Sequence, residues 1–154
     1  MKARTLVLTC ALVLSGVIPS LAQAPLMGTW TLNQAKSHMP AGTLATSTLV
    51  YETQGDTIKI TNDGTTDTGQ PIHTVWVGKF DGKDYPMTGD PTIDTRSYTL
   101  VDDHNVLFTS KKAGKVVYTG HVTVAPDGKS RATTTSGTAP DGNPYSYVRV
   151  HDKQ

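Results

Sequence analysis

The sequence predicts an all-β protein that folds as one antiparallel, up-and-down β-barrel of about eight to ten strands. Short runs of β-branched and aromatic residues recur about every ten residues, and turn sequences rich in Gly, Asp, Asn and Pro separate them. No run keeps the helical period over the length that the crossover helices of a parallel sheet need. Successive hairpins leave two open sheet edges, and closure of the sheet into a barrel removes both.

The N-terminal residues are typical of a secretory signal peptide. Lys2 and Arg4 precede an apolar run of about 13 residues, which is short for a membrane span, and Ala22-Gln23-Ala24 matches the small-residue cleavage pattern. We therefore expect cleavage after Ala24, so that residues 1–24 are removed. The remaining barrel domain, residues 25–154, is then periplasmic or secreted and has no membrane anchor.

The composition of the cleaved chain limits the possible partners. Removal of Lys2 and Arg4 leaves 12 basic residues against 13 acidic ones, so the formal net charge changes from +1 to −1. No basic patch remains, which excludes nucleic acid as an expected partner. The single cysteine, Cys10, leaves with the signal peptide, so no disulfide is expected despite export. This combination favours a bacterial periplasmic or secreted protein.

The strands are expected in simple succession. Gly and Asn at the intervening turns supply positive φ angles, and Pro presets the backbone conformation of the residue that precedes it. Residues 33–42 and 80–93 are expected to be irregular. The nine expected strands are residues 28–32, 46–53, 57–61, 72–80, 93–101, 106–111, 115–125, 131–135 and 145–151.

One turn sequence occurs twice. Residues 64–71 and 137–144 share the pattern G-T-x-x-x-G-x-P. We favour the interpretation that one hairpin type is used twice, and an old duplication of a half-barrel is the alternative.

Gly28 and Trp30 open the first strand and are expected to close one end of the barrel. Glycine lets the chain pack closely where it enters the barrel, and the indole ring fills that end of the barrel. The last strand should lie beside the first, which would bring Arg149 over the indole face of Trp30. Arg149 could instead point inward beside Tyr147 and anchor an acidic ligand.

Several segments resemble a family of small exported bacterial proteins described as lipocalin-like. These segments are residues 28–33, 35–37, 80–86, 88–91 and 152–154. The resemblance covers nearly the whole chain after the signal peptide, and it implies a barrel and export but no particular activity. Gly28, Trp30 and a late Arg give a more distant resemblance to lipocalins, which typically carry disulfides and a C-terminal helix that this sequence lacks.

The sequence contains no recognisable catalytic template. It has no nucleophile elbow, no dinucleotide fingerprint and no P-loop. Most carboxylates are Asp in expected turns, where the side chain bonds its own backbone. The five histidines show no short metal-ligand spacing, so neither a metal nor a cofactor is expected. A histidine facing the interior could ligate haem, which is a weaker alternative.

The interior is the remaining candidate site. Because side chains alternate along a strand, Val116, Tyr118, Gly120, Val122 and Val124 should share one face. A second such set is Ile72, Thr74, Trp76, Gly78 and Phe80, and a third is Tyr145, Tyr147 and Arg149. Trp76, Tyr118, Tyr147 and Arg149 are the candidate residues of a partly apolar cavity with one charged end.

Three classes of function follow from this pattern. The first is a non-enzymatic exported barrel that binds a small apolar or amphipathic molecule in its interior. The second is a solid-cored structural or interaction protein whose 80–93 loop presents Asp84, Tyr85, Met87 and Asp90. The third is an enzyme at the barrel mouth, with Asp84, Tyr85 or His73 as acid or base.

Overall fold

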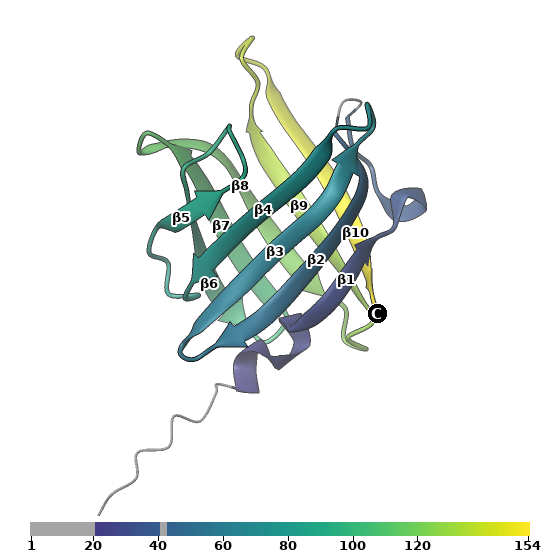
Figure 1. The fold of residues 1–154 in the computed structure, drawn as a ribbon, viewed down its shortest axis with the longest axis vertical. Coiled ribbons are helices and arrows are strands. Elements are labelled where there is room, and N and C mark those ends of the chain that lie inside the picture. Colours follow the sequence, from purple (N-terminus) through teal and green to yellow (C-terminus); the bar gives the residue numbers. More distant parts are fainter. Residues whose placement is uncertain (1–20, 41–42) are drawn as a thin grey trace, which may run out of the picture.

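The chain forms a closed barrel of ten antiparallel strands in up-and-down order (Figure 1). The computed structural model describes residues 21–40 and 43–154. Each strand pairs with the next along the chain, and the last strand pairs with the first, where Trp30 lies opposite Lys153. The predicted all-β, up-and-down barrel is therefore confirmed. The proposed cleavage site lies in described chain, but residues 1–20 of the predicted signal peptide lie outside it.

The strands vary from four to eleven residues in length. They are β1 (Gly28–Leu32), β2 (Leu44–Gln54), β3 (Thr57–Thr66), β4 (Pro71–Gly78), β5 (Tyr85–Thr88), β6 (Thr95–Asp102), β7 (Asn105–Lys112), β8 (Lys115–Val124), β9 (Ser130–Thr138) and β10 (Pro144–Lys153). Two short 3₁₀ helices, η1 (Leu21–Leu26) and η2 (Gln34–Lys36), flank β1. Neither of these described helices is long and apolar enough to cross a lipid bilayer.

The predicted 80–93 loop contains a strand, which corrects the sequence-based assignment. β5 pairs at two positions with β4 and at two positions with β6, and so bridges them (Figure 1). Its four residues include Pro86 and are too few for a recognisable alternation. Met87 lines the interior and Tyr85 packs edge-on against Trp76, at 5.7 Å between ring centroids. These side chains complete the barrel wall and are not presented on a free loop.

A bulge changes one predicted face. The β7–β8 register shifts between Ser110, which pairs with Tyr118, and Lys111, which pairs with Val116. Beyond this bulge the alternation of β8 reverses, so Val116 is 58% exposed, contrary to the prediction. Tyr118 and Val122 line the interior as predicted.

Trp30 lies at the closed end of the barrel, beside η1. It is fully buried, and its indole Nε1 donates a hydrogen bond of 2.9 Å to the carbonyl oxygen of Leu26. The cations over its ring are Arg131, at 5.6 Å from the centroid, and Lys153, at 4.9 Å. Gly28 opens the strand with a φ of 104°.

The predicted contact of Arg149 with Trp30 is wrong. Lys153, and not Arg149, lies opposite Trp30 in the β1–β10 ladder. Arg149 is four residues earlier on β10, about 13 Å along the strand from the closed end. Its guanidinium carbon lies 5.6 Å from the ring centroid of Tyr147, and the side chain lines the interior.

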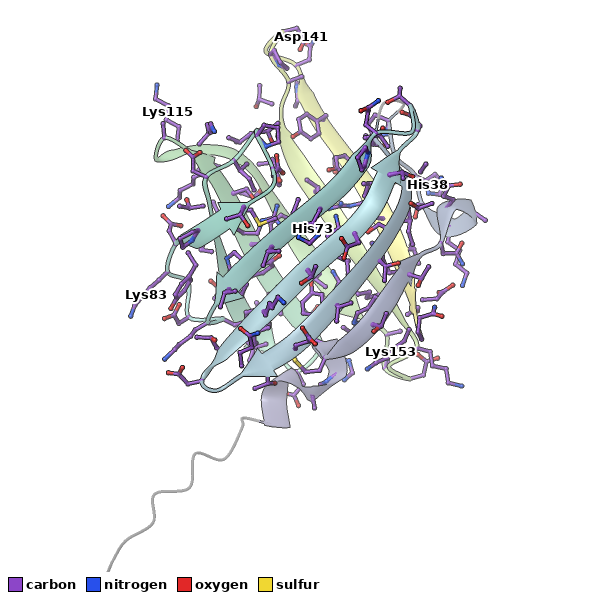
Figure 2. All side chains as sticks on the ribbon, viewed as in Figure 1. His38, His73, Lys83, Lys115, Asp141 and Lys153 are labelled. Atoms are coloured by element: carbon purple, nitrogen blue, oxygen red, sulfur yellow. The ribbon has the colours of Figure 1, made fainter. Side chains whose placement is uncertain are left out.

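The repeated turn sequence forms the same turn twice. In the β3–β4 connection the N–H of Thr66 bonds Gln70 O and the N–H of Gly69 bonds Thr66 O. The β9–β10 connection repeats both bonds with Ala139, Asn143 and Gly142 in the corresponding positions, at the tip marked by Asp141 in Figure 2. One hairpin type used twice accounts for the pattern.

The turn carboxylates mostly bond their own backbone, as predicted. Five of them accept a hydrogen bond from the N–H two residues later: Asp81, Asp90, Asp102, Asp127 and Asp141.

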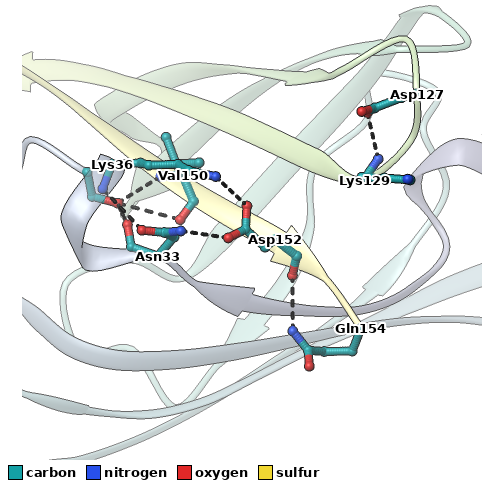
Figure 3. Close-up of polar contacts among 8 residues, drawn as sticks. Asn33, Lys36, Asp127, Lys129, Val150, Asp152 and Gln154 are labelled. Carbon is teal, nitrogen blue, oxygen red and sulfur yellow. Dashed lines mark hydrogen bonds and ion pairs between the residues drawn. The ribbon is translucent and has the colours of Figure 1, made fainter.

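On the outer face of β10, Asp152 accepts hydrogen bonds from Asn33 Nδ2 at 2.6 Å and Lys36 Nζ at 3.4 Å (Figure 3). Val150 N–H donates to Ser37 Oγ at 2.9 Å in the same region. These contacts fix η2 against β10.

Candidate ligand-binding cavity

The barrel encloses a cavity of about 470 Å³. It extends from the middle of the barrel toward the end that carries the β3–β4 turn. Residues at this end, which we call the mouth, are Thr43, Leu44, Thr66, Pro71, Gly89, Asp90, Pro91 and Thr92. Pockets that hold small organic ligands fall in the same size range.

One wall of the cavity is aromatic. Trp76 of β4, Tyr98 of β6, Phe108 of β7 and Tyr118 of β8 form a continuous series of rings. Consecutive centroids lie 4.7, 5.8 and 6.3 Å apart. The rings meet at tilted or edge-on angles, the arrangement that aromatic quadrupoles prefer. This wall offers an apolar surface of fixed shape.

Arg96 of β6 crosses the aromatic wall and is satisfied by neutral partners. Its guanidinium donates to Ser110 Oγ at 2.8 Å and to the Tyr118 hydroxyl at 2.7 Å. Its guanidinium carbon also lies 5.1 Å from the Phe108 centroid. Hydrogen bonds and π contacts thus hold the side chain in place, while its positive charge has no carboxylate partner among these contacts.

Arg131 of β9 lines the cavity and is only 3% exposed. Its guanidinium carbon stacks 4.8 Å from the Tyr51 centroid, and Nη2 donates weakly to Thr133 Oγ1 at 3.4 Å. Nε and Nη1 have no hydrogen-bond partner within the described chain. A buried charged donor without a partner costs free energy, and an acceptor that entered the cavity would remove this cost.

Arg149 and His151 of β10 adjoin Arg131. In the β9–β10 ladder His151 lies directly opposite Arg131, and Arg149 lies opposite Thr133. Arg149 is half-buried, and its Nε has no partner among the described residues. Burial, together with the charges of Arg131 and Arg149, lowers the pKa of His151 to about 3, so its ring is neutral at ordinary pH. We call Arg131 and Arg149 the inner cationic cluster, and the neutral His151 lies beside it.

The arginines of the described chain line the barrel interior, whereas its ion pairs involve other residues. All three arginines in the described ranges, Arg96, Arg131 and Arg149, line the cavity. The seven ion pairs of the described chain join Lys or His to Asp or Glu, and none includes an arginine. Among the cavity-lining residues the one carboxylate is Asp90 at the mouth, which accepts hydrogen bonds from Thr92. The interior is therefore positively charged.

The four candidate residues from the sequence, Trp76, Tyr118, Tyr147 and Arg149, all line this cavity. Sequence reasoning missed Arg96, Arg131 and His151. Alternation could have found them, because Arg96 shares a face with Tyr98, and His151 shares one with Arg149. It could not have shown that the inward faces of β6, β9 and β10 meet in one space.

The residues considered for catalysis at the mouth have separate partners. Asp84 accepts a hydrogen bond of 2.6 Å from Lys111, and the Tyr85 hydroxyl donates to Asp81 at 3.1 Å. His73 lies on the outer face of β4 and pairs with Asp63 at 2.6 Å (Figure 2). In the described part of the chain, no group of three or more His, Cys, Asp or Glu side chains is placed to hold a metal ion.

Comparisons with known proteins match this chain to solved structures alone. No family model matches the chain. No curated protein matches it. Among solved structures, EF1p2_mFAP2b bound to DFHBI is 14% identical with a TM-score of 0.48, over 88% of this chain and 100% of that one. The redesigned barrel mFAP1 bound to DFHBI is 17% identical with a TM-score of 0.44, over 88% and 100%. Lobster apocrustacyanin A1 is 10% identical with a TM-score of 0.40, over 86% of this chain and 62% of that one. Similarity at this level assigns no ligand to this chain.

Proposed function

We propose that this protein is an exported, non-enzymatic barrel that binds a small amphipathic molecule in its interior. The observation that carries the proposal is the cavity of about 470 Å³, with an aromatic wall on one side and the inner cationic cluster on the other. A solid-cored barrel would bury such side chains against each other. Here they border a space of ligand size.

Binding is tested with a neutral fluorescent probe and with the protein from its own host. N-phenylnaphthylamine carries no charge and fluoresces strongly in apolar surroundings, so we expect saturable enhancement with one probe per barrel. Native mass spectrometry of protein purified from its own host should show an additional small-molecule mass. Absence of both signals would contradict the binding proposal and favour a structural role.

Export is tested independently of binding. The intact mass of the protein recovered from its own host should correspond to a chain beginning at Pro25. A recovered chain that retains residues 1–24 would contradict the proposed cleavage.

A matched variant tests whether the probe enters the barrel. Gly89 lines the mouth, and a Cβ there would lie 1.9 Å from the backbone oxygen of His73, so that position is unsuitable for substitution. Thr74 lines the middle of the cavity on β4, whereas Val75 is the next residue and points outward. We expect Thr74→Trp to reduce probe fluorescence and Val75→Trp to leave it nearly unchanged.

A further inference from the structure

We propose that the inner cationic cluster binds a carboxylate, so that the ligand is an amphipathic organic acid with its acid group at Arg131 and Arg149. This inference deepens the proposed function and rests on it. It specifies the charge of the ligand and its orientation in the cavity.

The first argument is the unbalanced charge. Arg96, Arg131 and Arg149 place three positively charged guanidinium groups at one cavity. His151 contributes no positive charge, because its pKa is lowered to about 3. Asp90 lies at the mouth and bonds Thr92, so it does not neutralise the inner end. An anionic ligand supplies the charge that the described protein interior lacks.

The second argument is the hydrogen-bonding capacity of the cluster. Arg131 has two buried nitrogens without a partner and Arg149 has one, whereas all three side-chain nitrogens of Arg96 donate to hydroxyl groups of the described chain. Arg96 is thus held by the fold, while Arg131 and Arg149 retain donors for a ligand. Guanidinium groups bind carboxylates through short, charge-assisted hydrogen bonds.

The third argument concerns the rest of the cavity. Besides polar residues such as Asn62 and Thr74, the cavity lining includes five apolar or aromatic side chains: Leu49, Ile60, Trp76, Met87 and Phe108. These side chains do not suit a second polar group on the ligand, but they can bury its hydrocarbon or aromatic body. A free inorganic anion would use the cluster and leave this apolar surface uncovered. The two surfaces together fit an organic acid.

The test compares ligands that share a ten-carbon chain and differ in the head group, or share the carboxylate and differ in the apolar body. Binding of decanoate, decan-1-ol and acetate is measured by displacement of N-phenylnaphthylamine and by calorimetry at pH 7. We expect decanoate to bind about tenfold or more tightly than decan-1-ol, the difference expected for charge-assisted hydrogen bonds. Acetate should bind far more weakly than either.

Arg149→Met is the main variant, because Arg131 also packs between Trp30 and Tyr51 and its loss could unfold the barrel. Arg149→Met should remove most of the preference for decanoate while decan-1-ol binding persists, and Arg149→Lys should restore part of it. Lys115→Met is the control for net charge, since Lys115 lies on the outside at the β7–β8 turn (Figure 2). It should keep the full preference.

The outcomes separate this inference from the proposed function. If neither the probe nor any ligand binds, the binding function itself fails. If decan-1-ol and decanoate bind equally, or if Arg149→Met keeps the preference, the barrel binds ligands but the carboxylate inference is overturned. If acetate binds as tightly as decanoate, the site takes a free anion, which also overturns it.

Discussion

At the scale of single residues, arginine and lysine have separate roles in this barrel. In the described chain six lysines pair with carboxylates, as Lys111 does with Asp84, while the three arginines line the cavity. A lysine ammonium is compact and strongly hydrated, whereas a guanidinium can stack on rings and tolerate partial dehydration. Arg96 and Arg131 make such ring contacts. Lys153, which lies over the Trp30 ring, is an exception to this division.

Trp30 gives the clearest single-residue prediction for stability. Trp30→Ala removes a fully buried ring and the contacts of Leu26, Arg131 and Lys153 with it. We expect the free energy of unfolding to fall by about 3–5 kcal/mol, measured by urea denaturation. A loss below about 1 kcal/mol would show that the ring does not hold the closed end.

His151 predicts a dependence of stability on pH. Its pKa is about 3 in the fold, through burial and the nearby Arg131 and Arg149, against about 6.5 in the unfolded chain. The unfolded chain therefore binds the proton first as the pH falls. His151 then costs the fold about 1.4 kcal/mol for each pH unit between about 6.5 and 3.

The contribution of His151 is measured by comparison with His151→Gln. Denaturation midpoints are followed between about pH 5 and 6.5, where aspartates remain ionised. The wild-type protein should lose stability over this window and His151→Gln should lose less. Parallel curves for the two proteins would show that His151 does not titrate with a lowered pKa.

At the scale of elements, glycines in the strands make room for rings. A Cβ at Gly120 of β8 would lie 2.2 Å from Phe108 Cζ and 2.5 Å from Thr134 O. A Cβ at Gly78 of β4 would lie 2.5 Å from the Tyr85 ring. The cross-strand ring occupies the space over each glycine, so strand positions that lack a side chain still belong to the core.

Gly120→Ala tests this packing. The added methyl group must displace Phe108 or the β8–β9 backbone, and overpacking of this kind costs about 1–3 kcal/mol. Thr119→Ala on the outer face is the matched control and should change the free energy of unfolding by less. Equal effects in the two variants, measured by thermal denaturation, would contradict the close packing of Phe108.

At the scale of the whole molecule, closure joins the two ends of the described chain. β1 pairs with β10, Gln154 N–H donates to Thr29 O at 3.0 Å, and Lys153 Nζ donates to Pro25 O at 3.2 Å. The C-terminus and β1 therefore lie at the same end of the barrel (Figure 1). This end is opposite the mouth, so a link between the two termini would lie away from the cavity entrance.

A circular permutant tests this geometry. We expect a chain that links residue 154 to residue 25 and opens between Asp141 and Gly142 to fold, because the new ends lie at an exposed turn. It should retain a β-type circular dichroism spectrum, a cooperative melt and probe binding. A permutant that folds but no longer binds the probe would show that the β9–β10 turn itself shapes the cavity.

Alternation and turn chemistry are local properties, so the amino-acid sequence was sufficient to predict the all-β class, most strand positions, the repeated turn and the bonding of the turn aspartates. It also identified Trp76, Tyr118, Tyr147 and Arg149 as inward-facing side chains. The folded barrel was needed to show that β5 completes the wall, that a bulge turns Val116 outward, and that Arg131 rather than Arg149 lies over Trp30. These features depend on register, and register is set by pairing between strands distant in the sequence. For the same reason, the meeting of Arg96, Arg131 and Arg149 in one cavity became visible only when the barrel was closed.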